Sequence, residues 1–97
     1  MHARIVAGMA KPGTIDQGID IYKNSVAPAT KEQQGFKGVF FLVNRDTNKF
    51  TSVTLWETEA DMEAGEASGY LQEQIAKVAT IIAAPPTTEH YEVAAQA

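Results

Sequence analysis

The sequence predicts an α+β domain whose elements follow the order β-α-β-β-α-β. Three observations support this order. Short strand-like runs lie near both ends of the chain, two stretches repeat apolar residues at helical spacing, and two β-rich runs lie between those stretches. A chain of 97 residues can hold one hydrophobic core but not a second. Residues 1–97 are therefore predicted to form a single domain.

The first strand and the first helix are predicted within residues 3–28. Residues 3–9 (ARIVAGM) are a short apolar run, closed by Pro12-Gly13. The helix is predicted to begin at Thr14, because TIDQ has the form of a capping box in which Gln17 reaches back. Its buried face is marked by helical spacing of Ile15, Ile19, Tyr22 and Val26. Pro28 is expected to end or kink the helix, since proline has no amide hydrogen, and ATKEQQG is expected to be a polar exit.

Two strands are predicted in the middle of the chain. Residues 35–45 (GFKGVFFLVNR) place Val39, Phe41 and Val43 on one face, and Phe40 and Leu42 on the other. A strand that is apolar on both faces is expected to be covered on both faces. Residues 45–48 have the composition of a turn, and residues 49–57 (KFTSVTLWE) return as the next strand of a hairpin.

A second helical region and a last strand complete the predicted order. Thr58 is expected to cap a helix, with Asp61 at the reach-back position, and residues 62–67 continue it to a break at Ser68-Gly69. The next segment carries an apolar stripe of Leu71, Ile75, Val78 and Ile82, and Pro85-Pro86 ends it. Residues 87–95 alternate polar and apolar side chains, which predicts a half-exposed strand with Tyr91 in the core.

The order β-α-β-β-α-β is that of the ferredoxin-like fold, a four-stranded antiparallel sheet with two helices on one face. The strand at residues 35–45 is apolar on both sides, so the face without helices needs another cover. A second copy of the same sheet is the economical cover, because two-fold homodimers are the commonest assembly. We therefore expect two sheets to form a dimeric α+β barrel.

Composition excludes several function classes. The formal net charge of −4 and the scattered basic residues argue against a nucleic-acid partner, which needs a clustered basic face. The absence of cysteine removes disulfides and thiolate chemistry. The first residues lack the features of a secretory signal, and no apolar run reaches the ~20 residues that span a bilayer. A cytoplasmic protein without membrane partners is the expectation.

Several stretches together resemble the antibiotic-biosynthesis monooxygenase superfamily of dimeric α+β barrels. They are Pro12-Gly13, the GFKG that leads the second strand, LWETEADMEA, and the closing EHYEV. The resemblance covers nearly the whole chain. It implies a pocket in each subunit between the sheet and the helices. It also implies oxygenation without metal or flavin, in which an electron-rich substrate reduces oxygen once it is deprotonated and the protein stabilises a developing oxyanion.

The resemblance also indicates which residues to compare. Haem-degrading relatives have an Asn, a Trp and a His near the places of Val6, Gly65 and Ile75, so haem degradation is not expected here. The quinol-oxygenating relatives have an Asn and a Tyr at the places of Ser52 and Met62. Trp56 is the one position of this set that carries over.

Each candidate side chain has a functional and a structural interpretation. Trp56 could form a pocket wall or plug the sheet edge, and Tyr22 could turn its hydroxyl into a cavity or lie in the core. Tyr70 follows the helix break, where it could gate a pocket or form a surface contact. His90 could act as a base near neutral pH or lie at an interface. Arg4 and Arg45 could orient an anionic substrate, although charged residues at strand ends are usually solvated.

Two functional hypotheses follow. In the first, the protein is a cofactor-independent monooxygenase of a quinol-like or polycyclic aromatic molecule. Its candidate catalytic residues are Trp56 and Tyr22, and its candidate ligand-binding residues are Ser52, Met62, Tyr70 and His90. In the second, the same dimer is a non-catalytic small-ligand-binding or stress-associated protein. A dimer without a pocket is a third interpretation. No cofactor is predicted, and no metal, because His90 and Glu92 supply only two ligands.

Overall fold

A computed structural model describes all residues from Met1 to Ala97. The strands are β1 (His2–Met9), β2 (Phe36–Asn44), β3 (Lys49–Trp56) and β4 (Thr87–Glu92). The helices are α1 (Ile15–Ile21), the π-helix η1 (Tyr22–Val26), α2 (Ala27–Lys31), α3 (Glu59–Ala67) and α4 (Tyr70–Lys77). None of these helices has the length and apolar character needed to cross a membrane.

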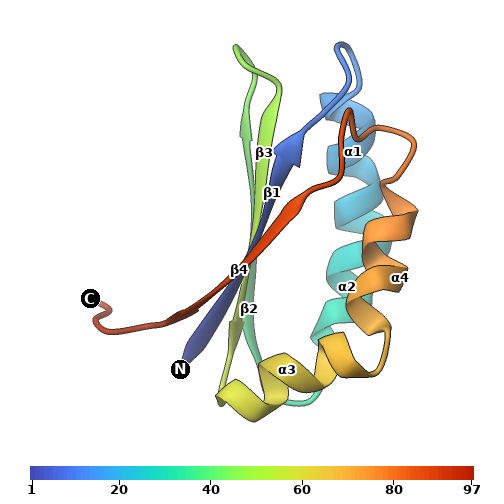
Figure 1. The fold of residues 1–97 in the computed structure, drawn as a ribbon. Helices are drawn as coiled ribbons and strands as arrows, with labels where there is room; N and C mark the ends of the chain where they lie inside the picture. Colours follow the sequence, from blue (N-terminus) through green and yellow to red (C-terminus); the bar gives the residue numbers. More distant parts are fainter.

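The strands form one antiparallel sheet in the order β2-β3-β1-β4, and all the helices lie against one face of it (Figure 1). The opposite face carries no helix (Figure 1). The predicted ferredoxin-like α+β fold is therefore confirmed. The barrel that two such sheets would form lies outside a single chain and stays a prediction.

The register of the central strands decides which side chains face the helices. Arg4 lies opposite Thr54 and Val6 lies opposite Ser52 in the β1–β3 pairing. Since successive side chains of a strand point to opposite faces, these residues share the helix-covered face. Gly8 lies opposite Phe50 on the same face, and a Cβ at Gly8 would come within 2.9 Å of the Phe50 ring. The glycine thus allows Phe50 to pack over β1.

The first helical region runs through Lys31, so Pro28 does not end the helix, and the alternative of a kink at Pro28 stays a prediction. The chain instead forms the wider π turn immediately before Pro28, and the Ala27 amide donates to the carbonyl of Tyr22. That turn accommodates a proline, which has no amide hydrogen to donate. The stretch predicted as a polar exit also contains Thr30, which is helical and buried. Lys77 of α4 donates to the Ser25 carbonyl of the π turn at 3.4 Å.

The predicted capping box at Thr14 is also wrong. The Thr14 side chain makes no capping bond and donates instead to the carbonyl of Lys11 at 2.6 Å. The second predicted cap is confirmed, because the Thr58 hydroxyl accepts from the Asp61 amide at 3.1 Å. The break at Ser68-Gly69 is confirmed too, since Gly69 has a φ of +84° directly before α4.

The second helix is shorter than predicted. It ends at Lys77, and the residues that follow pair with the end of β1. The Lys11 amide donates to the Ile81 carbonyl at 2.7 Å, and Ala10 forms a bridge with Ile82. This pairing pulls Ile81, rather than the predicted Ile82, into the core with Ala10 and Phe50.

The uncovered sheet face is apolar. Phe40 and Leu42 are 57% and 52% exposed, and both lie on this face as the strand alternation predicted. Tyr91, which the sequence placed in the core, is 50% exposed and donates to Glu89 at 2.8 Å. β4 is an edge strand, and no helix covers the side on which Tyr91 lies. Large apolar side chains gathered on one face are typical of interaction surfaces.

We expect this face to form a homodimer. Burying Phe40 or Leu42 would contribute about 1.5–3 kcal/mol for each side chain, so charging both should dissociate the pair. Light scattering should give a dimer mass for the wild type and a monomer mass for Phe40→Lys/Leu42→Glu. Ala64→Glu, which adds a charge on the exposed side of α3, should remain dimeric. A monomeric wild type at micromolar concentration would contradict the prediction.

Candidate functional site

A cavity of about 60 Å³ lies between the sheet and the helices. The strands contribute Arg4, Val6, Phe41, Phe50, Ser52 and Thr54; the helices and the turn after α4 contribute Tyr22, Val26, Thr30, Tyr70, Leu71, Gln74, Ile75, Val78 and Ile81. One water needs roughly 10–15 Å³ of such space, while typical small-molecule sites measure ~300–1,000 Å³. The cavity therefore holds a few waters or a small chemical group as it stands.

Tyr22 forms one polar point of the cavity. It is the first residue of the π-helix, and its hydroxyl lies 2.6 Å from the Ser52 hydroxyl on β3. Its ring stacks on Phe41 with the centroids 4.4 Å apart. Burial raises the pKa of Tyr22 above its ordinary value, and the Ser52 hydrogen bond offsets part of this shift. Tyr22 is thus a neutral phenol at neutral pH and can donate a hydrogen bond, but it is not a base.

Tyr70 forms a second polar point. The left-handed backbone at Gly69 starts α4 so that Tyr70 turns inward, where its hydroxyl bonds that of Thr30. Thr30 donates its own proton to the Val26 carbonyl at 2.9 Å, so Tyr70 is the donor in the hydroxyl pair. Burial raises the pKa of Tyr70, while Thr30 and Arg4 lower it in part.

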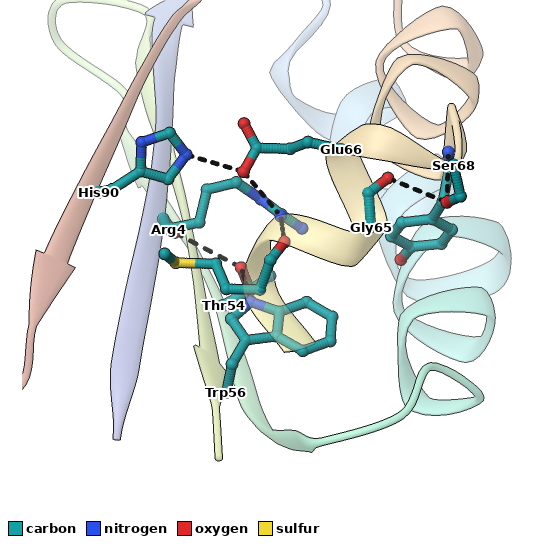
Figure 2. Close-up of polar contacts among 9 residues, drawn as sticks. Arg4, Thr54, Trp56, Gly65, Glu66, Ser68 and His90 are labelled. Carbon is teal, nitrogen blue, oxygen red and sulfur yellow. Dashed lines mark hydrogen bonds and ion pairs between the residues drawn. The ribbon is translucent and has the colours of Figure 1, made fainter. Parts of the chain in front are cut away.

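Arg4 supplies the only charge in the lining. The residue is 1% exposed, and its Nη1 donates to the Met62 carbonyl at 2.9 Å. The same nitrogen lies 3.5 Å from Glu66 Oε2, which also bonds His90 Nε2 at 2.7 Å (Figure 2). The guanidinium carbon lies 5.2 Å from the ring centre of Trp56, within cation–π range. Burial lowers the pKa of Arg4, and Glu66 opposes that shift.

A second, larger hollow adjoins the cavity. It is a groove of about 330 Å³ between the first helical region and β2, lined by Ile19, Tyr22, Lys23, Ala27, Val39, Phe41 and Val43. Tyr22 and Phe41 line both hollows, so their stacked rings form a shared wall.

The sequence model of the antibiotic biosynthesis monooxygenase family matches residues 1–77, which is most of the chain. The chain belongs to this family. Among curated proteins, the uncharacterized protein Rv2557 of Mycobacterium tuberculosis (strain ATCC 25618 / H37Rv) is 29% identical over 99 residues. The alignment covers 98% of this chain and 42% of the relative, so the chain spans less than half of that protein's length.

Solved structures share the family fold. A protein of unknown function from Nitrosomonas europaea, NE2512, has a TM-score of 0.78 and 25% identity; the match covers 99% of this chain and 91% of that one. The heme-degrader MhuD of Mycobacterium tuberculosis, solved with two hemes in its active site, has a TM-score of 0.80 at 18% identity. That match covers 100% of this chain and 99% of the MhuD chain. At this identity the likeness to MhuD concerns the fold alone.

The candidate residues named from the sequence fall into two groups. Tyr22, Ser52 and Tyr70 line the cavity. Trp56, Met62 and His90 do not line it and instead surround Arg4: Trp56 lies against the guanidinium, Met62 gives its carbonyl, and His90 reaches it through Glu66. Trp56 is fully buried, and its indole N–H donates to Thr54 at 2.9 Å. Trp56 thus packs at the end of the interior strand β3, outside the lining of the cavity.

The sequence interpretation underrated four polar residues of the lining. Thr30, Thr54 and Gln74 were not singled out, and Arg4 was expected to be solvated like other charged strand residues. Arg45 fits that expectation, because its side chain is 61% exposed and pairs with Asp16 at 3.0 Å. A signal for Arg4 was present, since it alternates with Val6 on the buried face of β1. For Gln74, the three-residue spacing from Leu71 was a comparable signal on α4.

The hydrogen bond between Trp56 and Thr54 is expected to stabilise the fold. Thr54→Val leaves the buried indole N–H without an acceptor, which should cost about 1–3 kcal/mol in the free energy of unfolding. Urea unfolding followed by circular dichroism measures the loss. Thr54→Ser keeps the hydroxyl and should lose less. In a Trp56→Phe background, which has no N–H, the cost of Thr54→Val should shrink; an unchanged cost would refute this account.

The buried phenols predict a loss of stability at high pH. The folded-state pKa of Tyr22 is raised, so its contribution is complete below the unfolded pKa near 10 and is lost as pH rises towards the folded value. The unfolding free energy should therefore fall above about pH 10. Tyr22→Phe should lose less stability over that range than the wild type. Parallel pH profiles for the two proteins would show that Tyr22 does not contribute.

Proposed function

We propose that this chain is a cofactor-independent monooxygenase that oxidises a quinol-like aromatic molecule in the cavity between the sheet and the helices. Family membership supports the reaction class. The observation that carries the proposal is the lining itself, in which the paired hydroxyls of Tyr22–Ser52 and Tyr70–Thr30 project from apolar walls. The Tyr22–Ser52 pair keeps one proton to donate, which suits an oxyanion that develops in a site shielded from bulk water.

The reaction needs no external reductant. One quinol and one O₂ give one hydroxyquinone and one water: a ring carbon gains an oxygen atom and loses its hydrogen, and the ring loses two electrons more as it becomes a quinone. The second oxygen atom takes up two protons and leaves as water. The substrate thus supplies all four electrons that reduce O₂. The protein has to favour the deprotonated quinol and exclude bulk water.

The residues of the chain have distinct parts in this proposal. Tyr22 donates a hydrogen bond to a substrate oxygen, and Ser52 holds the Tyr22 hydroxyl in place. Tyr70 donates its proton to Thr30 and contributes its ring to the cavity wall. Trp56, Met62 and His90 act as positioning residues, because each contacts Arg4 or its partner Glu66. As it stands the cavity is too small for an aromatic ring, so a one-ring substrate requires the shared Tyr22–Phe41 wall to move.

Binding without catalysis is the second candidate function. No carboxylate or imidazole lines the cavity, and the pKa values of Tyr22 and Tyr70 are both raised. The lining therefore offers no base at neutral pH, and the substrate would have to lose its proton to solvent. A protein that only sequesters a small aromatic molecule needs no base.

Oxygen uptake separates the two functions. With hydroquinones as substrates, we expect saturable O₂ consumption by the wild type and formation of one hydroxyquinone for each O₂. Tyr22→Phe removes one oxyanion donor and should lower kcat by up to roughly 100-fold. Tyr91→Phe alters an exposed tyrosine outside the cavity and should leave the rate unchanged.

Three results would change this conclusion. Binding of hydroquinones without O₂ uptake would replace the enzyme with the binding protein. An equal rate in Tyr22→Phe and the wild type would remove Tyr22 from the reaction. An absence of both binding and uptake would overturn the proposed function.

A further inference from the structure

Two buried polar atoms of the chain have no hydrogen-bond partner, and both belong to residues that line the cavity. They are Nε of Arg4, on β1, and Oε1 of Gln74, on α4. The two residues are 1% and 7% exposed. Buried polar groups are nearly always paired, and leaving one unpaired costs about 1–3 kcal/mol. Two such groups on residues that line one cavity can bond a polar ligand or water that enters it.

The charge of Arg4 is only partly compensated within the protein. Both hydrogen bonds of the guanidinium run through Nη1. One goes to a neutral carbonyl, and the other reaches Glu66 at 3.5 Å, at the outer limit of a hydrogen bond. Glu66 makes its shorter contact, 2.7 Å, with His90. Arginine preferentially binds a carboxylate through two parallel N–H···O hydrogen bonds, whereas Arg4 makes a single contact with Glu66.

The surroundings leave one side of the guanidinium for a ligand. The centre of the Trp56 ring lies 5.2 Å from the guanidinium carbon, and Gly65 of α3 lies close enough that a Cβ there would be in van der Waals contact with Nη1, at 3.7 Å. Neither group can neutralise a cation. The cavity, by contrast, is bordered by Arg4, Thr54, Tyr70 and Gln74 without a carboxylate among its lining residues. A negatively charged oxygen entering it would meet one cation and several neutral hydrogen-bonding groups.

We propose that Arg4 binds an anionic oxygen of the ligand and that Gln74 bonds a second polar group on the same molecule. The ligand class is therefore a one-ring aromatic anion, carrying a carboxylate or a phenolate, with a hydroxyl substituent. This proposal rests on the proposed function in taking the cavity as the substrate site. It narrows the substrate from quinols in general to those that bind as anions.

Calorimetric titration with a matched set of ligands tests the proposal. The probes are 4-hydroxybenzoate, 4-hydroxybenzamide and 4-nitrophenol, the last above and below its own pKa. The carboxylate or the phenolate should bind at least 10-fold more tightly than the neutral amide, because a charge-assisted hydrogen bond is roughly twice as strong as a neutral one. Preference for one anion identifies the source of the anionic oxygen. Equal binding of the neutral amide, or no binding by either anion, would overturn the proposal.

Variants locate the binding group. Arg4→Gln should weaken anion binding roughly 10- to 100-fold. Arg45→Gln removes the same charge from an exposed pair with Asp16 and should leave binding unchanged. Should Arg4→Gln fail to fold, Gln74→Glu decides, since it places a competing carboxylate in the cavity. It should abolish anion binding while binding of the neutral amide persists; unaltered anion binding in Gln74→Glu would contradict the proposal.

The two proposals fail separately. Arg4-dependent binding of an anion without any O₂ uptake would refute the monooxygenase and leave the anion site standing. Oxygen uptake with neutral hydroquinone that is undiminished in folded Arg4→Gln would refute the anion site and leave the monooxygenase. Trp56 fluorescence gives a second readout in the titration with 4-hydroxybenzoate, because the indole lies against the guanidinium.

Discussion

The burial of the Arg4 guanidinium is the constraint on which the inner face of the sheet depends. A cation removed from water costs several kcal/mol unless charges and dipoles replace its hydration. Here the replacements come from three elements: the Met62 carbonyl and Glu66 from α3, the Trp56 ring from β3, and His90 from β4 through Glu66. The position of α3 over the sheet is thereby coupled to one side chain of β1.

That coupling explains the local features around it. The Thr58 cap starts α3 so that the Met62 carbonyl accepts a hydrogen bond from Arg4. Thr54 holds the Trp56 indole while lying opposite Arg4 in the sheet register. The buried cation of Arg4 is what these contacts have in common. Together they form a support whose remaining open side is the cavity.

The sequence predicted the fold because its strongest signals are local and periodic. Alternation along β2 assigned Phe41 and Phe40 to opposite faces, and the composition around Thr58 and Gly69 located the ends of helices. The errors arose where an irregular turn or a distant contact overrode a simple local rule. Pro28 is tolerated because a π turn forms immediately before it. Helix α4 ends early because residues 81–83 pair with the end of β1, a contact that cannot be read from a neighbouring stretch of sequence.

The same distinction applies to the site. Spacing placed Tyr22 on the inner face of its helix, but the partner hydroxyl of Ser52 lies thirty positions away and only the register of β3 brings it near. Trp56 attracted attention as the single tryptophan, whereas Arg4 looked like an ordinary charged strand residue. Arg4 has more influence on the site than Trp56, although a charged residue is the type least expected in a protein interior. The local clue was that Arg4 and Val6 lie two positions apart on β1 and therefore on the same buried face.

Strand β3 also connects the two faces of the sheet. Ser52 and Thr54 point towards the cavity, while Val53 and Leu55, which alternate with them, point to the face that carries Phe40 and Leu42. A second sheet packed on that face would restrain β3 and, with it, the hydroxyls that hold Tyr22 and Trp56. Assembly and ligand binding would then act on one strand from opposite sides. The hydroxyls of the cavity and the apolar outer face are therefore physically linked through β3.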